Sequence, residues 1–228
     1  MFTQLGNQKN ANSNRTLPWI YGPGFTALDA IGPYELLRSL PESEVRFVHH
    51  DVGPVTADSN VLTIMTTHSL EETPTPDIIL VPGSGTHTLI AAQDEVLRAW
   101  LNKVHLTTKR TLSVCTGSVI LAAAGLLKDK PATTHWLAQD YLEQFGAIAR
   151  RNDRVVKTGK TVTAAGVSAG IDLALTVIDD LCGRDYAELV QLQVEYDPQP
   201  HLNSGHPTKA SEIVVDKAKQ RMLGRAEL

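Results

Sequence analysis

The sequence predicts an α/β fold, in which helices cover both faces of a mainly parallel sheet. Apolar runs typical of strands alternate with helix-spaced patterns along the 228 residues. The run Asp77–Gly83 is strongly apolar and ends in a turn, as a central parallel strand does. No repeat, linker or low-complexity segment interrupts this alternation. We therefore expect one domain over residues 16–228, preceded by a polar, disordered leader, residues 1–15.

Composition and charge exclude several classes of protein. The formal net charge of −4 gives no basic surface for nucleic acid, so we expect no nucleic-acid partner. No run of about 18 apolar residues exists, and the leader lacks an apolar signal core, so we expect no membrane span. Two cysteines, Cys115 and Cys182, make no disulfide framework, which favours reduced thiols and a cytoplasmic location.

The pattern places the expected elements as follows. Strands or hairpin strands are expected at 17–21, 45–49, 53–57, 61–65, 77–83, 111–114, 155–156 and 161–163. Helices are expected in the second half of 25–40, with Pro33 near its start, and at 95–106, 118–124, about 136–145, 166–182, 186–196 and 211–223.

Cys115 lies where the apolar run Thr111–Val114 turns into a helical run of small residues that Gly125 ends. A nucleophile at such a turn stands out of the strand on a strained backbone, and the first amides of the helix point towards it. Those amides favour a thiolate, so we expect the pKa of the Cys115 thiol to be lowered. The alternative is a buried cysteine that acts as a small hydrophobic residue.

Two further turns are expected beside Cys115, because sites in such folds form at the carboxyl ends of strands. Asp29 stands just before a predicted helix, where it is either an acid partner of the cysteine or a helix cap. The turn Gly83-Ser84-Gly85 follows a central strand, and its glycines let backbone amides approach a ligand. A cysteine, a carboxylic acid and backbone amides suit covalent chemistry at an electrophilic carbon.

The histidines and the search for cofactor motifs identify no further functional site. His135, in Thr133-Thr-His-Trp136, is either a partner of Cys115 or a buried histidine satisfied by hydrogen bonds. His49 and His50 are adjacent and should point to opposite faces of a strand. No HxxxH or CxxC spacing exists, so we expect no metal, and without GxGxxG or GxxxxGK[ST] we expect no nucleotide or other cofactor.

Several motifs, taken in order, resemble the DJ-1/PfpI superfamily over roughly residue 17 to the end. They are Leu28-Asp-Ala-Ile-Gly-Pro33, Val81-Pro-Gly83, Ser113-Val-Cys-Thr-Gly117, Ala123-Ala-Gly-Leu-Leu127, Ala132-Thr-Thr-His-Trp136 and Ala169-Gly-Ile-Asp172. Cys-Thr-Gly, Thr-Thr-His-Trp and the late segment Val190–Tyr196 resemble the isonitrile hydratases of that superfamily. Sensor domains of some AraC-type regulators share the first two motifs.

The resemblance implies a flavodoxin-like three-layer αβα sandwich and a homodimer. It also implies Cys115 as the nucleophile, Asp29 as its acid partner and Thr116 beside them. From the positions of the turns we also expect Gly83, Ser84 and His135 around the substrate, with backbone amides there stabilising developing charge. Superfamily peptidases carry His directly after the cysteine, whereas this chain has Thr116, and DJ-1-type proteins carry Glu where it has Asp29. The turn Gly83–His87 is less glycine-rich than in the hydratases, which bears on the shape of the pocket.

The activity that the resemblance implies is addition of water to an isonitrile, giving an N-substituted formamide through a cysteine thioimidate. The same cysteine and acid would also serve a glyoxalase-type hydratase. Two other classes remain open: a redox or electrophile sensor in which Cys115 is oxidised reversibly, and a non-catalytic module that binds a small molecule.

Overall fold

The computed structural model describes residues 15–20 and 22–224. Within that part of the chain, the main sheet has seven strands. In the order in which they lie side by side, these are β10 (Val155–Thr158), β11 (Thr161–Ala164), β7 (Arg110–Val114), β6 (Ile78–Val81), β1 (Arg15–Ile20), β2 (Ser43–His49) and β5 (His68–Ser69). Every neighbouring pair is parallel except β10 and β11, which form an antiparallel hairpin at one edge.

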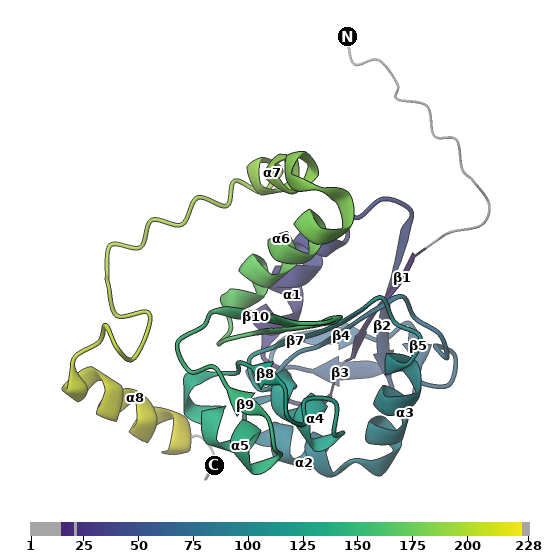
Figure 1. Ribbon diagram of the computed structural model, residues 1–228. Helices are drawn as coiled ribbons and strands as arrows, with labels where there is room; N and C mark the ends of the chain where they lie inside the picture. The colour runs from purple at the N-terminus through teal and green to yellow at the C-terminus, as the bar shows by residue number, and fades with distance from the viewer. Residues whose placement is uncertain (1–14, 21, 225–228) are drawn as a thin grey trace.

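Helices cover both faces of the sheet, which confirms the predicted architecture (Figure 1). One face carries α1 (Ala27–Leu37) and α6 (Ala169–Cys182), with α7 (Arg184–Gln193) packed on α6. The other face carries α2 (Thr88–Gln93), α3 (Glu95–His105), α4 (Gly117–Ala123) and α5 (Gln139–Gln144). Short pieces complete the body: η1 (Gly85–His87), η2 (Trp136–Ala138), the hairpin of β3 (Pro54–Thr56) and β4 (Thr63–Met65), and the pair β8 (Pro131–Ala132) and β9 (Ile148–Ala149).

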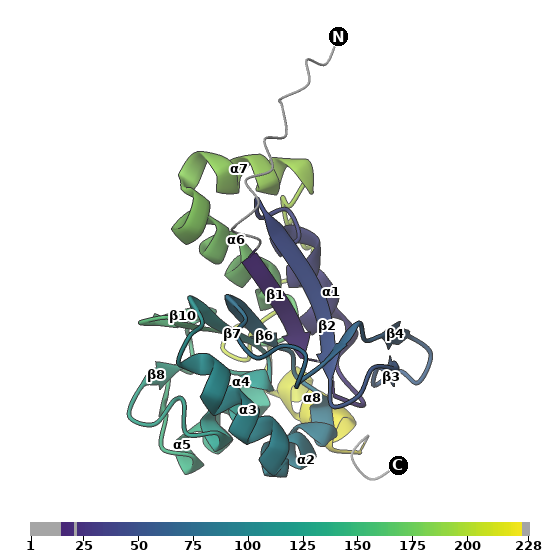
Figure 2. The same ribbon diagram turned by 90° about the vertical axis from the view of Figure 1, so that its right-hand side faces the viewer.

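The sheet separates two apolar cores, one under α1 and α6 and one under α2 to α5. These two groups of helices lie on different sides of the sheet in Figure 2. Along β6, alternate residues enter alternate cores: Ile78 and Leu80 pack under α1 and α6, whereas Ile79 and Val81 pack under α2 to α4. All four side chains are buried, which explains why this strand is continuously apolar in the sequence. None of the helices among the described residues is long and apolar enough to cross a membrane.

The chain order of the strands creates a topological switch point. From β1 the chain winds to β2 and β5 on one side, and from β6 it winds to β7 and β11 on the other. The switch therefore lies between β1 and β6, which is where ligands bind in flavodoxin-like sheets. Arg15, the last residue of the predicted leader, opens β1; residues 1–14 of that leader lie outside the described residues.

Two local predictions are wrong. Helix α1 begins at Ala27, so Asp29 lies in its first turn and not before it, and Pro33 lies inside the helix. The N-cap position belongs to Thr26, which makes no side-chain capping bond. Strand β2 ends at His49, so the alternation of strand side chains does not extend to His50, and the two imidazole rings lie 5.1 Å apart between centroids.

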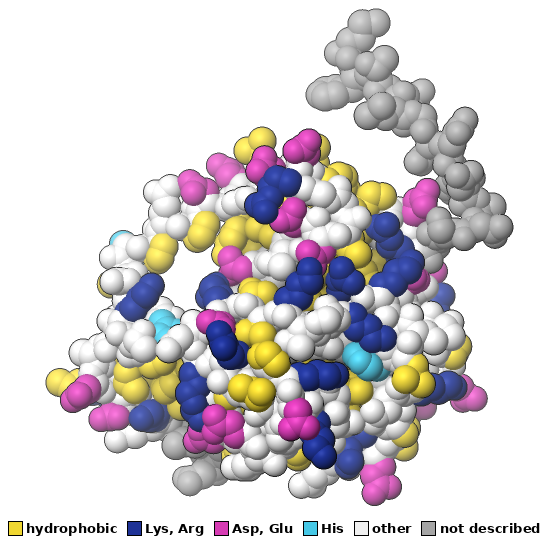
Figure 3. Space-filling model, in the orientation of Figure 1, with side chains coloured by type: hydrophobic (Ala, Val, Ile, Leu, Met, Phe, Trp, Pro, Cys, Tyr) yellow, Lys and Arg dark blue, Asp and Glu magenta, His cyan; other side chains and the backbone are white. Residues whose placement is uncertain are grey.

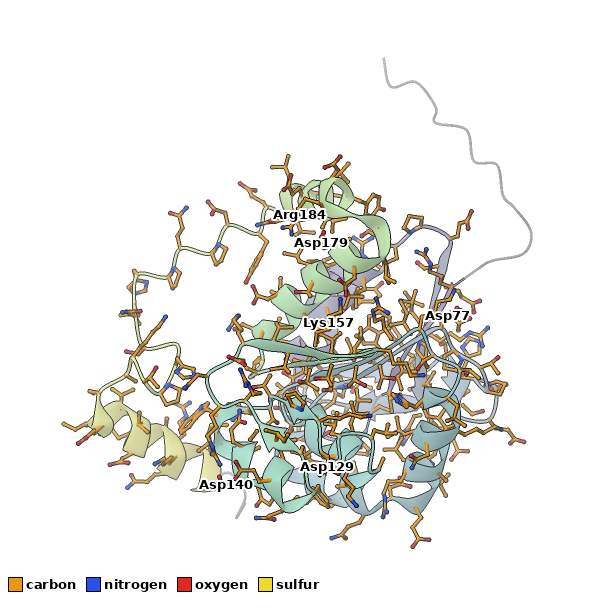
Figure 4. The ribbon with its side chains drawn as sticks, viewed as in Figure 1. Asp77, Asp129, Asp140, Lys157, Asp179 and Arg184 are labelled. Carbon is orange, nitrogen blue, oxygen red and sulfur yellow. The ribbon has the colours of Figure 1, made fainter. Side chains whose placement is uncertain are left out.

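A long segment leaves the body after α7. It runs without regular structure to α8 (Glu212–Gly224), which lies beside the body at the far end (Figure 1). In the space-filling view a gap separates this segment from the rest of the molecule (Figure 3). At the start of α7, Arg184 pairs with Asp179 of α6 at 2.8 Å across the turn between the helices (Figure 4). The segment 197–211 together with α8 is called the C-terminal arm below.

Candidate active site

The residues predicted to form the site follow three strands that are adjacent and parallel in the sheet. Asp29 follows β1, Gly83 follows β6 and Cys115 follows β7, and these strands are neighbours in the sheet. Because parallel strands end at the same edge, the three turns meet at the switch point between β1 and β6. The structure therefore brings together the three turns that the sequence singled out.

Cys115 has a backbone that L-amino acids rarely adopt, with φ at 55°. Hydrogen bonds on both sides hold this conformation. The Cys115 amide donates to the Ala165 carbonyl at 2.9 Å, and its carbonyl accepts from the Thr134 hydroxyl at 2.8 Å and the Ser118 hydroxyl at 3.1 Å. The surroundings thus fix a strained residue between β7 and α4, as is common at functional sites.

Asp29 is fully buried and does not cap a helix. Its Oδ2 accepts a hydrogen bond of 3.0 Å from the Gly83 amide. Its Oδ1 is buried without a hydrogen bond of good geometry to any described residue. Burial raises the pKa of the Asp29 carboxyl to about 7, although the Gly83 amide and the Cys115 thiol act in the opposite direction. A carboxyl with such a pKa can give or take a proton near neutral pH.

The predicted lowering of the pKa of the Cys115 thiol is reversed. Burial raises that pKa strongly, and the neighbouring charge of Asp29 raises it further. Hydrogen bonds from the Val167 and Thr116 amides to the sulfur act the other way, as the turn geometry led us to expect, but burial outweighs them. Above about pH 7 the two side chains together therefore hold one proton, which either group can carry.

Thr116 organises the edge of the site. Its hydroxyl accepts from the Ser84 amide at 3.3 Å and lies 2.6 Å from the Thr88 hydroxyl, which also accepts from the Ser84 amide. The amides of Gly83 and Ser84 are thus both bonded to protein groups. Their predicted role in binding substrate stays a prediction, and it requires these bonds to be exchanged.

Two glycines are required by close packing at the site. A Cβ on Gly83 would lie 2.6 Å from the Thr116 hydroxyl and 2.7 Å from Asp29 Oδ2. A Cβ on Gly117 would lie 2.0 Å from the Val81 carbonyl oxygen, inside any permitted contact. The glycine of Cys-Thr-Gly therefore lets α4 begin against the end of β6.

His135 lies near the site without bonding to Cys115. Its Nδ1 accepts from the Leu137 amide at 3.3 Å at the start of η2, and its ring lies over Gly166, where a Cβ would come within 2.6 Å of Cδ2. Burial lowers the pKa of the imidazole, which favours the neutral form. The neighbouring Thr134, not His135, donates to Cys115. Among the described residues, no group of three His, Cys, Asp or Glu side chains is arranged to hold a metal ion.

Sequence reasoning missed three contributors. The backbone amide of Val167, whose φ is 36°, donates to the sulfur. Because any residue except proline could provide this amide, the residue type at position 167 did not predict the bond. Thr134 and Thr88 act through hydroxyls far away in sequence from the residues they contact. The pair Thr133-Thr134 was visible as part of a motif, but nothing in the sequence showed which residue faces Cys115.

With this geometry described, comparison with known proteins identifies the family. The DJ-1/PfpI family model matches residues 19–180, which span all three turns. The chain belongs to the DJ-1/PfpI family. Among solved structures, a THiJ/PfpI family protein from Pseudomonas syringae aligns with a TM-score of 0.89 and 33% identity, over 100% of this chain and 95% of that one. DJ-1β of Drosophila melanogaster, at 18% identity and a TM-score of 0.73, covers 80% of this chain and 98% of its own, and shares the fold.

Two curated proteins to which the chain is similar belong to different functional classes, an enzyme and a transcriptional regulator. The isonitrile hydratase of Pseudomonas putida is 44% identical over 200 residues, which is 87% of this chain and 86% of that enzyme. The transcriptional regulator CdhR of Pseudomonas aeruginosa is 30% identical over 177 residues, which is 75% of this chain but 52% of the regulator. The chain thus matches nearly the whole of the enzyme and about half of the regulator.

Proposed function

We propose that this protein is an isonitrile hydratase, which adds water to an isonitrile and releases an N-substituted formamide. The observation that carries the proposal is the buried pair of Cys115 and Asp29 at the switch point, in a chain 44% identical to an isonitrile hydratase. An isonitrile carbon must gain both a proton and a nucleophile. The pair offers one of each, from side chains that share a single proton.

The first step forms a covalent intermediate. In the reactive form of the pair, Asp29 carries the proton and Cys115 is a thiolate, whose charge the Thr116 and Val167 amides stabilise. The sulfur attacks the terminal carbon while Asp29 protonates that same carbon. The product is a thioimidate, in which the carbon holds one hydrogen, the sulfur and the doubly bonded nitrogen, and Asp29 is left as a carboxylate.

The second step adds water. The Asp29 carboxylate takes a proton from water as the oxygen attacks the thioimidate carbon, and that proton passes to the nitrogen. The tetrahedral intermediate then expels the Cys115 thiolate, and its hydroxyl proton returns to Asp29. One water is consumed, a formamide leaves, and the pair regains its starting state. The pKa of about 7 suits Asp29 to act first as acid and then as base.

Turnover of a simple aryl isonitrile by the purified protein tests the proposal. We expect the matching N-aryl formamide to form with the wild type and to fall to background in Cys115→Ser, with Cys182→Ser as the matched control that retains activity. The same protein is then given methylglyoxal, the substrate class of a glyoxalase-type hydratase. Formamide production that survives in Cys115→Ser, or conversion of methylglyoxal without conversion of the isonitrile, would contradict the proposal.

We propose further that the protein is a homodimer in which the C-terminal arm of one copy packs against the other copy. The arm begins at a fixed point, because the Tyr196 hydroxyl donates to Asp172 of α6 at 3.2 Å. Beyond it the chain stands off the body, with Leu202 68% exposed (Figure 3). In α8, Ile213 is also 68% exposed, and Val214 and Met222 are exposed as well. An extended arm that leaves apolar side chains uncovered fits an interface between copies.

Light scattering tests the dimer. We expect a dimer mass at micromolar concentration for the wild type and a shift towards the monomer in Ile213→Asp. The matched control is Val61→Asp, which places the same charge at an apolar residue of the β3–β4 hairpin that is still more exposed, at 87% against 68% for Ile213. A monomer mass for the wild type, or equal effects of the two substitutions, would contradict an interface through the arm.

Two further proposals concern the domain boundaries of the protein and its location in the cell. We propose that residues 16–228 act as a single domain, because one sheet and its two helical layers include every described strand of the site. The described cysteines, Cys115 and Cys182, are both free thiols. Free thiols suit a reducing compartment, which supports the cytoplasm as the location.

A further inference from the structure

A cavity of about 410 Å³ is lined in part by Pro82 and Ser84 but not by Cys115. It opens beyond the carboxyl ends of β1, β2 and β6, and α2 and α3 close it from the helical layer. Most of its wall is apolar, formed by Ile20, Leu70, Val81, Ile90, Leu97 and Ile120. Both its volume and its lining are typical of sites for small organic molecules.

The cavity is separate from the site described above. Neither Asp29 nor Cys115 lines it, and Thr116 and His135 do not either. Its buried wall belongs to the core under α2 to α4, whereas Cys115 belongs to the core under α1 and α6. Ser84 is common to both, because it lines the cavity and its amide donates to the Thr116 hydroxyl at 3.3 Å.

The lining of the cavity includes a hydrogen-bonded pair, His50 and Asp94. His50 Nε2 lies 2.5 Å from Asp94 Oδ2, and the other oxygen of Asp94 accepts from the Leu97 amide at 2.9 Å, which caps α3. Each oxygen of Asp94 thus takes part in one hydrogen bond, and the bond with Nε2 orients the His50 ring. His49 and His87 also line the cavity.

The charges around the cavity restrict what it can bind. Among the described residues, no Lys or Arg lines it, and its one ionised carboxylate is Asp94. A carboxylate or phosphate ligand would lose its hydration there, would meet no Lys or Arg side chain, and would lie near the Asp94 carboxylate, which is costly. When Nε2 of His50 donates to Asp94, Nδ1 of the same ring is left to accept a hydrogen bond. The pair therefore suits a ligand that donates a hydrogen bond and carries no charge.

We propose that this cavity binds an uncharged, mostly apolar small molecule with a hydroxyl or N–H group, of the phenol, aryl alcohol or indole class. The apolar walls bury the ring or chain, and the imidazole of His50 accepts the hydrogen bond of the ligand. This inference is independent of the hydratase activity, because it uses no residue that the proposed mechanism assigns to the chemistry.

Methyl NMR of the full chain, with ¹³C in the isoleucine δ1 methyls, tests the proposal. Ile20, Ile90 and Ile120 line the cavity, whereas Ile78, Ile148 and Ile213 lie elsewhere and serve as internal controls. We expect benzyl alcohol to shift the first three signals saturably and to leave the controls in place. Benzoate, which has the same ring and a negative charge, should bind at least tenfold more weakly.

Variants distinguish binding in the cavity from binding elsewhere. Ala91→Trp fills the cavity from α2 and should abolish the saturable shifts; should that variant melt early, Ile90→Trp at the exposed rim provides the same block. His50→Phe should weaken benzyl alcohol about three- to tenfold, the value of one hydrogen bond. Cys115→Ser should leave binding unchanged, so a failed hydratase assay does not affect this result. Absent shifts, shifts that persist in both blocked variants, or a preference for benzoate would overturn the proposal.

Discussion

The substitution Asp29→Asn should raise the stability of the protein at pH 8 and lower its turnover of an isonitrile, so it separates the role of Asp29 in folding from its role in the chemistry. The fold raises the pKa of Asp29 from its usual 3.8 to about 7. The folded state therefore holds this proton more tightly than the unfolded state, and the resulting stabilisation is present below pH 3.8 and is lost as pH rises towards 7. Over that interval of about three pH units, the ionised carboxylate costs the wild type about 4 kcal/mol.

An asparagine at position 29 avoids this cost at every pH. It has nearly the same shape, carries no charge and can still accept the hydrogen bond of the Gly83 amide. We therefore expect Asp29→Asn to be more stable than the wild type at pH 8. Its advantage in free energy of unfolding should be about 3 kcal/mol larger at pH 8 than at pH 4.5. Turnover of an aryl isonitrile should fall by roughly two or more orders of magnitude, the scale of a lost general acid and base.

Urea unfolding at both pH values, at one fixed protein concentration, measures the stability difference, and an isonitrile assay at pH 8 measures turnover. Asp51→Asn, at an exposed residue in the turn after β2, is the matched control and should show neither effect. Equal stability differences at pH 4.5 and pH 8 would refute the argument that burial sets the pKa of Asp29. A variant that still turns over at the parent rate would refute the proposed role in proton transfer.

Three further predictions follow from the same contacts. Gly83→Ala should lower stability by about 1–3 kcal/mol and reduce turnover, because its methyl group forces apart the Thr116 hydroxyl and the Asp29 carboxyl; thermal melting and the isonitrile assay measure both. Thr134→Val should cost only about 1 kcal/mol in urea unfolding, because a second hydroxyl still donates to the Cys115 carbonyl, and a loss above 3 kcal/mol would contradict this. The kcat/KM for an isonitrile should rise with pH through about 7, as the pair loses its second proton; a profile that falls there would show that the doubly protonated pair is the active form.

The sheet and most of its helices could be predicted from the sequence because burial patterns are local. The run Asp77–Gly83 is apolar since β6 faces a core on each side, and Gly125, with φ at 80°, follows the end of α4 as predicted. Helix α2 was missed because its six residues are too few for a clear period. The start of α1 was placed late because Pro33 suggested an early helical position, whereas it lies within the helix.

The site could be located from the sequence, but its electrostatics could not. The order of motifs placed Asp29, Gly83 and Cys115 at adjacent strand ends, which follows from topology alone. The direction of the pKa shift of Cys115 depends on how much of the fold covers it, and burial here outweighs the amides that the turn supplies. His50 and Asp94 are 44 positions apart in the sequence, so no local sequence pattern could predict that they pair.

The contact between Gly117 and the Val81 carbonyl has a consequence for how such motifs are interpreted. Two positions of Cys-Thr-Gly contain reactive or hydrogen-bonding side chains, but the third is constrained by the distance between a helix and the neighbouring strand. Any protein that starts this helix against this strand needs glycine there, whether or not it performs chemistry. A shared Cys-Thr-Gly is therefore evidence of a common backbone arrangement. The Asp29 carboxyl after β1 is different, because no packing requirement of this kind explains a buried carboxyl whose Oδ1 lacks a hydrogen bond of good geometry among the described residues.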